Sequence, residues 1–347
     1  MEYEMRKLIL NTVILLLLLI SNSYGQLERS TSKVGTTAAT FLKINAGARA
    51  IGMAGAFVAM ENDIYSIYYN PAGLSRITGT GSAAFNHANW LADMSYDFAA
   101  LSLNLGDIGS MALSLISFSV PEEKVRTFDN PEGDGRYWDA SSLALGVSYA
   151  RNLTDNFSIG FNFKYIRDQV WDMSASSFAI DAGTMYTTPF NGLRIGASIS
   201  NFGTKMKLEG RNTYFNVDPN NNPNSGPNNI PAEYRLSYYD IPLSFRVGLA
   251  MEVIKSQLLT LTTSVDAVHP NDNTEYLNLG LELNFNNYFF ARTGYKSLFL
   301  RDSEQSLTFG FGLNYPVFND IGLSLNYGFA DYGRLKNVQF LDLVVRF

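Results

Sequence analysis

Strict two-residue alternation decides the fold of this chain, and it is clearest in Leu277-Asn278-Leu279-Gly280-Leu281-Glu282-Leu283-Asn284-Phe285. Every second side chain is large and apolar, and those between are Asn, Gly or Glu. Successive side chains of a β-strand point to opposite faces, so the stretch predicts a strand with one apolar and one polar face. The same alternation recurs at residues 157–165, 307–315 and 321–329.

The chemistry of the polar face separates two architectures. In a soluble β-sandwich the polar face meets water and carries many Lys, Glu and Thr residues, but here Gly, Ser, Ala and Asn dominate. Small residues suit the crowded interior of a barrel whose apolar face meets lipid. Aromatic residues close many apolar faces, in the manner of the girdles at membrane interfaces, as at Trp90, Tyr149, Tyr165, Tyr186 and Tyr327. We therefore favour a transmembrane β-barrel over a sandwich.

About fourteen such strands can be placed, an even number as in bacterial outer-membrane barrels. Each is close to the roughly 9 to 11 residues that a tilted spanning strand requires. The fold class predicted is an all-β membrane protein, an antiparallel transmembrane β-barrel. The predicted strands are 79–90, 94–105, 109–120, 137–151, 157–168, 176–188, 193–203, 242–253, 258–268, 276–286, 288–297, 305–315, 321–331 and 338–347.

The connections are sorted by length. Every second one is short, at 106–108, 152–156, 189–192, 254–257, 286–287 and 316–320, whereas most others are longer, notably 121–136 and 204–241. Outer-membrane barrels have short periplasmic turns and long external loops, and a sandwich has no such sorting. The Asn-rich stretch 220–229 is interpreted as an external loop and not as an interdomain linker, because the strand pattern is the same on both sides of it.

Composition excludes several function classes. Charged residues make up 17% of the 347 residues, below the roughly 25% of soluble domains, and the net charge is −6. Without a Lys/Arg-rich run, nucleic-acid binding is not expected. The absence of Cys excludes disulfides, thiolate zinc sites, Cys nucleophiles and lipid attachment at an N-terminal Cys. No cofactor and no metal site are predicted.

The first 25 residues predict a cleaved signal peptide. Arg6 and Lys7 precede an apolar run at 8–20, and small residues at Ser23 and Gly25 suit a signal peptidase. The alternative, a membrane anchor, is disfavoured because the run is shorter than the roughly 20 residues that a spanning helix needs. The expected organisation is a signal peptide at 1–25, an N-terminal plug (hatch) at 26–78 and the barrel at 79–347.

Residues 26–78 do not alternate, and small residues dominate 47–59. Asn62 or Asp63 is expected to cap a short helix that runs through Tyr69, and Asn70-Pro71 is expected to end it in a turn. Fourteen strands enclose a lumen that wall side chains alone do not fill, so we favour a plug with short helices over a periplasmic tail.

One run within this segment resembles a known family. It comprises Ala48-Arg49-Ala50, Gly52, Gly55-Ala56, Asp63 and Asn70-Pro71-Ala72-Gly73-Leu74, and it resembles the N-terminal signature of the PorV/PorQ outer-membrane proteins of Bacteroidetes. The best-known members belong to the type IX secretion system. The turn and the plug are also similar to the wider FadL-like group of fourteen-stranded transporters for fatty acids and other hydrophobic compounds.

The resemblance implies a role in the outer membrane of a Gram-negative, Bacteroidetes-like bacterium. The implied partners are type IX secretion components and the C-terminal domains of exported cargo. The FadL-like alternative implies uptake of a hydrophobic, fatty-acid-like compound. For either role the chain is expected to contact outer-membrane lipid and not to be an enzyme.

Charges within the predicted strands are the next candidates. An Arg or Lys that faces lipid near the midplane costs about 2 to 4 kcal/mol, so these side chains are expected to face the lumen and to pair there. The predicted lumen-facing charges are Lys164, Asp181, Arg194, Arg246, Glu252, Asp266 and Glu282, together with Asp342 and Arg346. Residues with a predicted plug or gate role are Arg49, Asp63, Asn70, Pro71, Ala72 and Gly73, with Arg49 expected to meet wall carboxylates. The alternative for Arg49 is structural pairing without a gate.

The remaining motifs carry little chemistry. The last strand ends at Phe347, which resembles the terminal signal that the outer-membrane assembly machinery recognises. Gly79-Thr80-Gly81 lacks the strand-turn-helix context of a phosphate loop. His87 and His269 are far apart in sequence, and nothing near either one supports a Ser-His-Asp or metal site of a hydrolase.

Overall fold

A computed structural model describes residues 33–218, 229–301, 303–318 and 321–347. The predicted signal peptide at 1–25 and the first part of the predicted plug, 26–32, lie outside the described residues.

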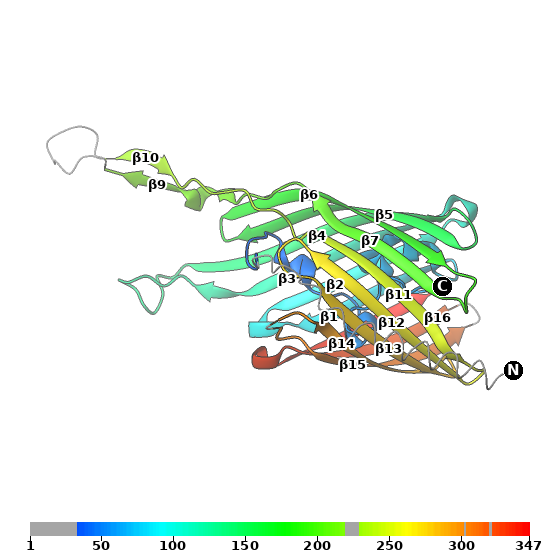
Figure 1. The fold of residues 1–347 in the computed structure, drawn as a ribbon. Coiled ribbons are helices and arrows are strands. Elements are labelled where there is room, and N and C mark those ends of the chain that lie inside the picture. The colour runs from blue at the N-terminus through cyan, green and yellow to red at the C-terminus, as the bar shows by residue number, and fades with distance from the viewer. Residues whose placement is uncertain (1–32, 219–228, 302, 319–320) are drawn as a thin grey trace. The chain divides into compact units, whose positions relative to one another are not determined.

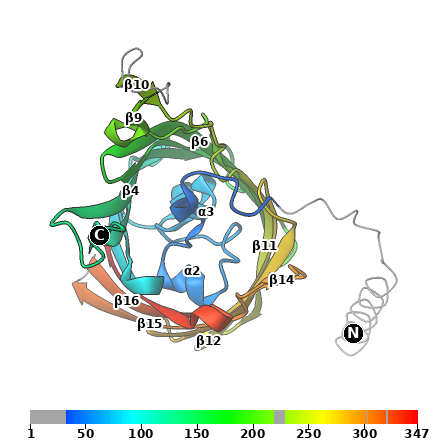
Figure 2. The same ribbon diagram turned by 90° about the vertical axis from the view of Figure 1, so that its left-hand side faces the viewer.

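Fourteen antiparallel strands form a closed wall, which confirms the predicted barrel (Figures 1 and 2). Sequence neighbours pair along most of the wall, β7 pairs with β11, and β1 pairs with β17 to close the ring. The wall strands are β1 Gly81–Asn89, β2 Ser95–Asn104, β3 Ser110–Lys124, β4 Tyr137–Asn152, β5 Phe157–Val170, β6 Met173–Thr187, β7 Arg194–Gly203, β11 Ser244–Lys255, β12 Leu259–Pro270, β13 Tyr276–Phe285, β14 Phe289–Leu298, β15 Leu307–Phe318, β16 Ile321–Asp331 and β17 Asn337–Arg346.

The ends of the predicted strands differ from the observed ones by at most four residues. The largest difference is in β3, which continues past Pro121 although proline lacks the N–H that a ladder needs. The register of β3 against β4 shifts between Val120 and Glu123, so the proline lies in a bulge where no ladder bond is lost. The β3–β4 hairpin thereby extends beyond the barrel (Figure 1).

The six connections predicted to be short all lie at one end of the barrel, called here the turn end, and the two longest, β3–β4 and β7–β11, lie at the other, the loop end. The loop end also has short connections, and the shortest joins β5 to β6 by Trp171 and Asp172 alone. The long β7–β11 connection carries β8 Glu209–Gly210, which pairs with β6, and a separate hairpin of β9 Tyr214–Val217 and β10 Ile230–Glu233 that projects outward (Figure 1). By the rule for outer-membrane barrels, the turn end faces the periplasm.

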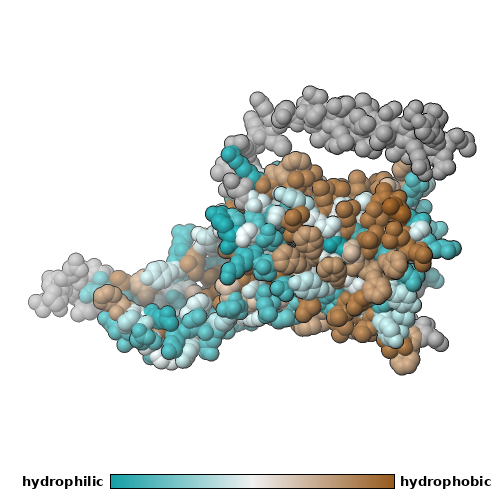
Figure 3. All heavy atoms as spheres, turned by 90° about the horizontal axis from the view of Figure 1, so that it is seen from below, coloured by the Kyte–Doolittle hydropathy of each residue, from teal (hydrophilic) through white to brown (hydrophobic). Residues whose placement is uncertain are grey.

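The two faces of the strands have opposite chemistry. Leu281 is 42% exposed on the outer face, whereas the next residue, Glu282, is 4% exposed on the inner face. Apolar side chains gather over the barrel wall in the space-filling view, and the loop end is more hydrophilic (Figure 3). This arrangement places the apolar face of each strand against lipid and the polar face against the lumen.

The predicted aromatic ends fall into two groups. Tyr149 and Tyr186 are exposed on the outer face. Trp90 instead turns inward, with its ring centroid 5.2 Å from that of Tyr332 and 6.1 Å from that of Phe340. The prediction that Trp90 faces lipid was therefore wrong, because edge-to-face packing over the mouth of the lumen buries this ring.

Residues 33–80, called here the inner segment, lie within the ring of strands (Figure 2). Their short helices are η1 Thr40–Lys43, α2 Ala48–Gly52, α3 Ser66–Tyr69 and η2 Pro71–Arg76. Phe57, Tyr65 and Tyr69 are almost fully buried. Tyr65 belongs to a core with wall residues such as Phe98 and Phe340, and Phe57 and Tyr69 belong to a second core with Ala250 of β11. The other short helices are η3 Leu91–Asp93, η4 Gly106–Ile108, η5 Arg211–Thr213 and η6 Gly333–Leu335. Across the described residues, no helix has the length and apolarity to cross a membrane.

If the outer face of the wall contacts lipid, a new charge there should lower the free energy of unfolding, whereas a new charge in an exposed loop should not. We expect Leu281→Arg, at the middle of β13, to lower the free energy of unfolding by about 2 to 4 kcal/mol, because the guanidinium would enter hydrocarbon. Phe128→Arg is the control, because Phe128 is 100% exposed in the β3–β4 connection. Urea unfolding of the refolded chain in liposomes measures both. Equal midpoints for the two variants would contradict the assignment.

Candidate functional site

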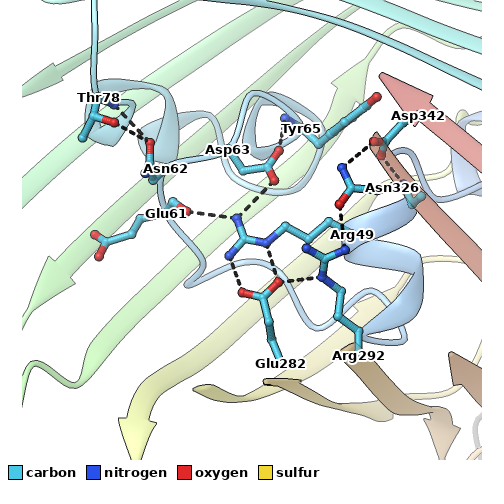
Figure 4. A network of polar contacts seen from close by, with 11 residues as sticks. Arg49, Glu61, Asn62, Asp63, Tyr65, Thr78, Glu282, Arg292, Asn326 and Asp342 are labelled. Carbon is cyan, nitrogen blue, oxygen red and sulfur yellow. Dashed lines mark hydrogen bonds and ion pairs between the residues drawn. The ribbon is translucent and has the colours of Figure 1, made fainter. Parts of the chain in front are cut away.

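The inner segment is held to the wall by a chain of buried polar contacts that starts at α2 (Figure 4). Arg49 projects from α2 and donates from Nε and Nη2 to the two carboxylate oxygens of Glu282 on β13, at 2.8 and 2.7 Å. Its Nη1 donates to Asp63 at 3.1 Å, within the inner segment itself. The two-point contact with Glu282 fixes both the position and the orientation of the guanidinium.

The contacts continue along the wall and return to α2. Arg292 on β14 donates from Nε to Glu282 at 2.6 Å and from Nη1 to Asn326 on β16 at 2.8 Å. Asn326 donates to Asp342 on β17 at 2.7 Å, and Asp342 accepts the backbone N–H of Ala48 at 2.7 Å. We call Arg49, Asp63, Glu282, Arg292, Asn326 and Asp342 the anchoring network.

Five of the six members of the anchoring network are buried, and the side chain of the sixth, Arg49, is only 16% exposed, so most of these groups have exchanged water for one another. Desolvation consumes much of the attraction in such ion pairs, and the net stabilisation is small. The loss of one partner is costly, about 3 to 5 kcal/mol, because a charge is left buried and unpaired. The anchoring network is therefore better suited to defining where the inner segment sits than to adding stability.

Wall carboxylates also accept backbone N–H groups of the inner segment. Asp266 on β12 accepts from Phe57 at 2.7 Å and from Val58 at 3.0 Å, and Asp168 on β5 accepts from Ala39 at 3.1 Å. These N–H groups lie in irregular backbone that has no ladder or helix partner for them. A buried donor without a partner costs about 1 to 3 kcal/mol, so the carboxylates remove that penalty.

Asn70 joins three pieces of backbone. Its amide donates to the carbonyls of Val58 at 2.8 Å and of Thr184 on β6 at 2.9 Å, and its carbonyl accepts from Ala72 at 3.1 Å. Pro71 begins η2, and Pro71, Ala72 and Gly73 are all buried. Asn70 ends α3, as predicted, and in addition caps η2 and ties it to the wall.

Glycines on the wall allow the inner segment to approach at backbone distance. A Cβ built on Gly183 would lie 2.0 Å from Oδ1 of Asn70, and one on Gly160 would lie 2.4 Å from the backbone of Pro71. Real Cβ atoms do not approach so closely, so only glycine fits. Wall glycines of this kind, called here the glycine belt, contact residues 48–72 at Gly160, Gly183, Gly196, Gly248, Gly280, Gly294, Gly310 and Gly328.

The other predicted lumen charges lie on the inner face but differ in their partners. Lys164 pairs with Asp181 at 2.7 Å. Arg194 pairs with Glu61 of the inner segment at 2.5 Å and lies 3.9 Å from Glu252.

Arg246 and Arg346 have no ion pair among the described residues. Arg246 lies over the ring of Tyr69, 5.7 Å from its centroid, and over that of Tyr68 at 6.0 Å. Burial raises the pKa of Tyr68 to about 12, although the nearby Arg246 acts in the opposite direction. The phenol stays neutral at physiological pH, so it contacts Arg246 through the ring without neutralising it.

The sequence prediction missed three members of this arrangement. Arg292 alternates with the outward-facing Ala291 and Thr293, as the predicted lumen charges alternate with their neighbours. The two-residue alternation could therefore have identified it. Glu61 lies outside any strand, and Asn326 is one of many inward Asn residues, so neither carried a signal.

The prediction for Asp63 as a helix cap needs correction. The helix begins at Ser66, and the residue at its N-cap position is Tyr65. Asp63 accepts from the N–H of Tyr65 at 2.9 Å, which leaves its other oxygen for Arg49. Asp63 therefore precedes the helix by three residues, and it bonds to the backbone before the helix and to Arg49 at the same time.

The two histidines lie near the loop end, each beside a carboxylate. His87 contacts Asp97 at 2.7 Å on the outer face, and His269 contacts Glu275 at 2.8 Å. No serine hydroxyl bonds to either imidazole in the described part of the chain. Nor do those residues contain a group of three or more His, Asp or Glu that could hold a metal ion. The Phe347 carbonyl accepts from Thr80 and Gly81 at 2.8 Å, so the last residue is tied to the start of the barrel.

Comparison with known proteins gives one family and one fold. The model of the family described as type IX secretion system protein PorV matches residues 27–259. No curated protein sequence matches the chain.

Solved structures that resemble the chain include a Pseudomonas aeruginosa FadL homologue, with a TM-score of 0.51 and 12% identity over 92% of this chain and 99% of that one. The Pseudomonas putida toluene transporter TodX has a TM-score of 0.55 and 11% identity, and the Ralstonia pickettii toluene transporter TbuX has 0.54 and 10%. Each alignment with these two transporters covers 87% of this chain and 97% of the other. At these identities the likeness shows the fold alone.

The glycine belt predicts that one added methyl group disturbs the seating of the inner segment. We expect Gly183→Ala to lower the free energy of unfolding by about 1 to 3 kcal/mol, because its Cβ overlaps an Asn70 side chain that is fixed by three hydrogen bonds. Gly322→Ala is the matched control, because nothing described lies within 4 Å of a Cβ there. Urea unfolding in detergent micelles compares the two, and a Gly183→Ala midpoint equal to that of the control would refute the close approach.

Proposed function

The chain belongs to the PorV family of type IX secretion system proteins, and we propose that it acts in protein export or surface attachment by binding other envelope proteins and the C-terminal domains of cargo. It is an outer-membrane β-barrel of that family. The observation that carries the proposal is the family match, because it spans the inner segment and most of the wall up to β12.

The loop end offers surfaces for such partners. The β3–β4 extension and the β9–β10 hairpin project beyond the barrel (Figure 1). Phe128 is fully exposed on the first, and Tyr214 and Tyr238 are exposed on or near the second. Exposed aromatic side chains on projecting elements are typical of protein-interaction sites, because a partner would remove them from water.

The inner segment supports a role as a plug. The anchoring network, the carboxylate contacts and the glycine belt all hold it against the wall. Between Tyr68 of the inner segment and Lys164, Asp181 and Arg246 of the wall, the remaining cavity is about 20 Å³, which is room for about one water molecule. A solute that took this route would require the inner segment to move, with Arg49 as the contact to be released.

A second candidate function is a FadL-like channel for a hydrophobic compound. One observation favours it: a cavity of about 420 Å³ opens at the loop end, and its lining is mostly apolar. The apolar and aromatic lining residues are Phe41, Ile44, Trp90, Met94, Phe118 and Tyr332, and the polar ones are Thr40, Lys43 and Gln305. This volume and a mostly apolar lining with a few polar groups suit a small hydrophobic ligand. The family match favours the export role.

Isolation of native complexes separates the two functions. We expect the full-length chain, tagged and purified in mild detergent from its own outer membrane, to recover type IX secretion components and cargo with C-terminal domains. Phe128→Ser should reduce recovery several-fold, because an exposed aromatic anchor would be lost, whereas Leu153→Ser, an exposed residue at the turn end, should not. A monomer that carries only a bound hydrophobic compound would instead support the channel.

Permeability tests the plug. Arg49→Ala removes four hydrogen bonds at once and leaves Glu282 and Asp63 without this cation, so we expect weaker seating of the inner segment and increased uptake of small solutes. The stability cost should be about 3 to 5 kcal/mol. Liposome swelling with the purified barrel measures uptake, and Arg136→Ala, which removes an external pair with Asp134, is the control. Unchanged permeability of Arg49→Ala would exclude the gate and leave plain structural pairing.

A further inference from the structure

The turn end of the lumen contains a second cavity, of about 360 Å³, beneath the inner segment. Its lining includes Arg194, the first residue of β7, Arg346, the last of β17, and Asn287 in the β13–β14 turn. The cavity is therefore on the side that faces the periplasm. None of the apolar residues that line the loop-end cavity contributes to it.

The carboxylates that line this cavity are already engaged. Glu282 bonds to Arg49 and Arg292, Asp63 bonds to Arg49, and Glu61 bonds to Arg194. Glu252 accepts from Lys255 at 2.8 Å. A cation entering the cavity would have to displace one of these partners, so the cavity is unsuited to a positive ligand.

Positive groups, in contrast, remain available. The guanidinium of Arg346 has no hydrogen bond or ion pair to any described residue, although its backbone pairs with β1 and β16. Arg194 is 5% exposed, and its buried Nε has no partner. Arg292 uses Nε and Nη1 in the anchoring network, which leaves its Nη2 without a described partner. Buried donors without partners are costly, and a ligand that accepts from them would remove that cost.

The neighbouring side chains suit an oxyanion. Asn287 and Asn314 line the same cavity, and the side-chain amide of Asn314 has no hydrogen bond to any described residue. Guanidinium groups present forks of N–H donors that match the oxygens of carboxylates and phosphates. We propose that this cavity is a binding site for a small, soluble carboxylate or phosphate that enters from the periplasm, with Arg346 as the principal contact and Arg194 and Arg292 as the buried donors.

The site is independent of the export role, because it lies at the end of the barrel opposite the projecting hairpins. The cavity shares Arg49, Glu282 and Arg292 with the anchoring network, whereas Arg346, the principal contact, takes no part in that network. Binding would place a negative charge beside Arg292 without requiring the inner segment to leave its seat.

The test uses the purified full-length chain in a neutral detergent, so that lipid headgroups supply no phosphate. Inorganic phosphate and acetate are titrated separately by calorimetry at low ionic strength, with chloride as the reference anion. We expect saturable binding of at least one oxyanion, and a loss of about tenfold or more in affinity for Arg346→Gln. Arg151→Gln is the matched control, because Arg151 is an exposed arginine near the same end but outside the cavity.

A second variant tests the site in case Arg346→Gln does not fold. Asn314→Asp adds a negative charge to the cavity without breaking a described contact, and it should also weaken binding. If Arg346→Gln fails to insert, Asn314→Asp decides the outcome. The proposal is overturned if neither oxyanion binds saturably, or if Asn314→Asp and a folded Arg346→Gln bind as tightly as the unchanged chain.

Discussion

The close approach of two backbones is the constraint on which the rest of this structure depends. The inner segment is mostly irregular, so its N–H and C=O groups need partners within a lumen that excludes most water. The wall meets that need in two ways: glycines let the segment come near, and carboxylates accept its N–H groups. Gly183, which leaves room for Asn70, is an example of the first. Asp266, which accepts the N–H groups of Phe57 and Val58, is an example of the second. The abundance of small residues on the inner face is therefore explained by contact with backbone.

The buried charges follow from the same constraint. An Arg such as Arg49 gains little stability from burial, because desolvation offsets much of its attraction to Glu282. It does gain a defined position, because its guanidinium contacts β13 and the inner segment together and the network returns through Asp342 to Ala48. The polar contacts therefore define where the segment sits, and the packing of its buried side chains against the wall contributes the stability.

The two ends of the lumen have opposite chemistry. At the loop end Trp90, Phe41 and Phe118 line an apolar cavity beneath projecting hairpins, whereas at the turn end Arg194, Arg292 and Arg346 line a polar one. A third and much smaller cavity, of about 20 Å³, lies beside Tyr68. The export role proposed for the loop end and the oxyanion site proposed for the turn end therefore involve different parts of the barrel.

The alternation of the sequence by itself determined the strands, their number, their lipid-facing sides and the sorting of the connections, because these properties depend on neighbours one or two residues apart. It also placed the lumen charges, since parity gives the face of a residue. Only the tertiary structure decided their partners. Arg49 and Glu282 are separated by 233 positions, and the closure of the wall and its register brought them together. The same holds for the inward side chain of Trp90, for the contact between Asp63 and Arg49, and for the absence of a described partner for the Arg346 side chain. Each depends on which residues distant in sequence lie nearby in the fold, and the local spacing of residues does not specify that.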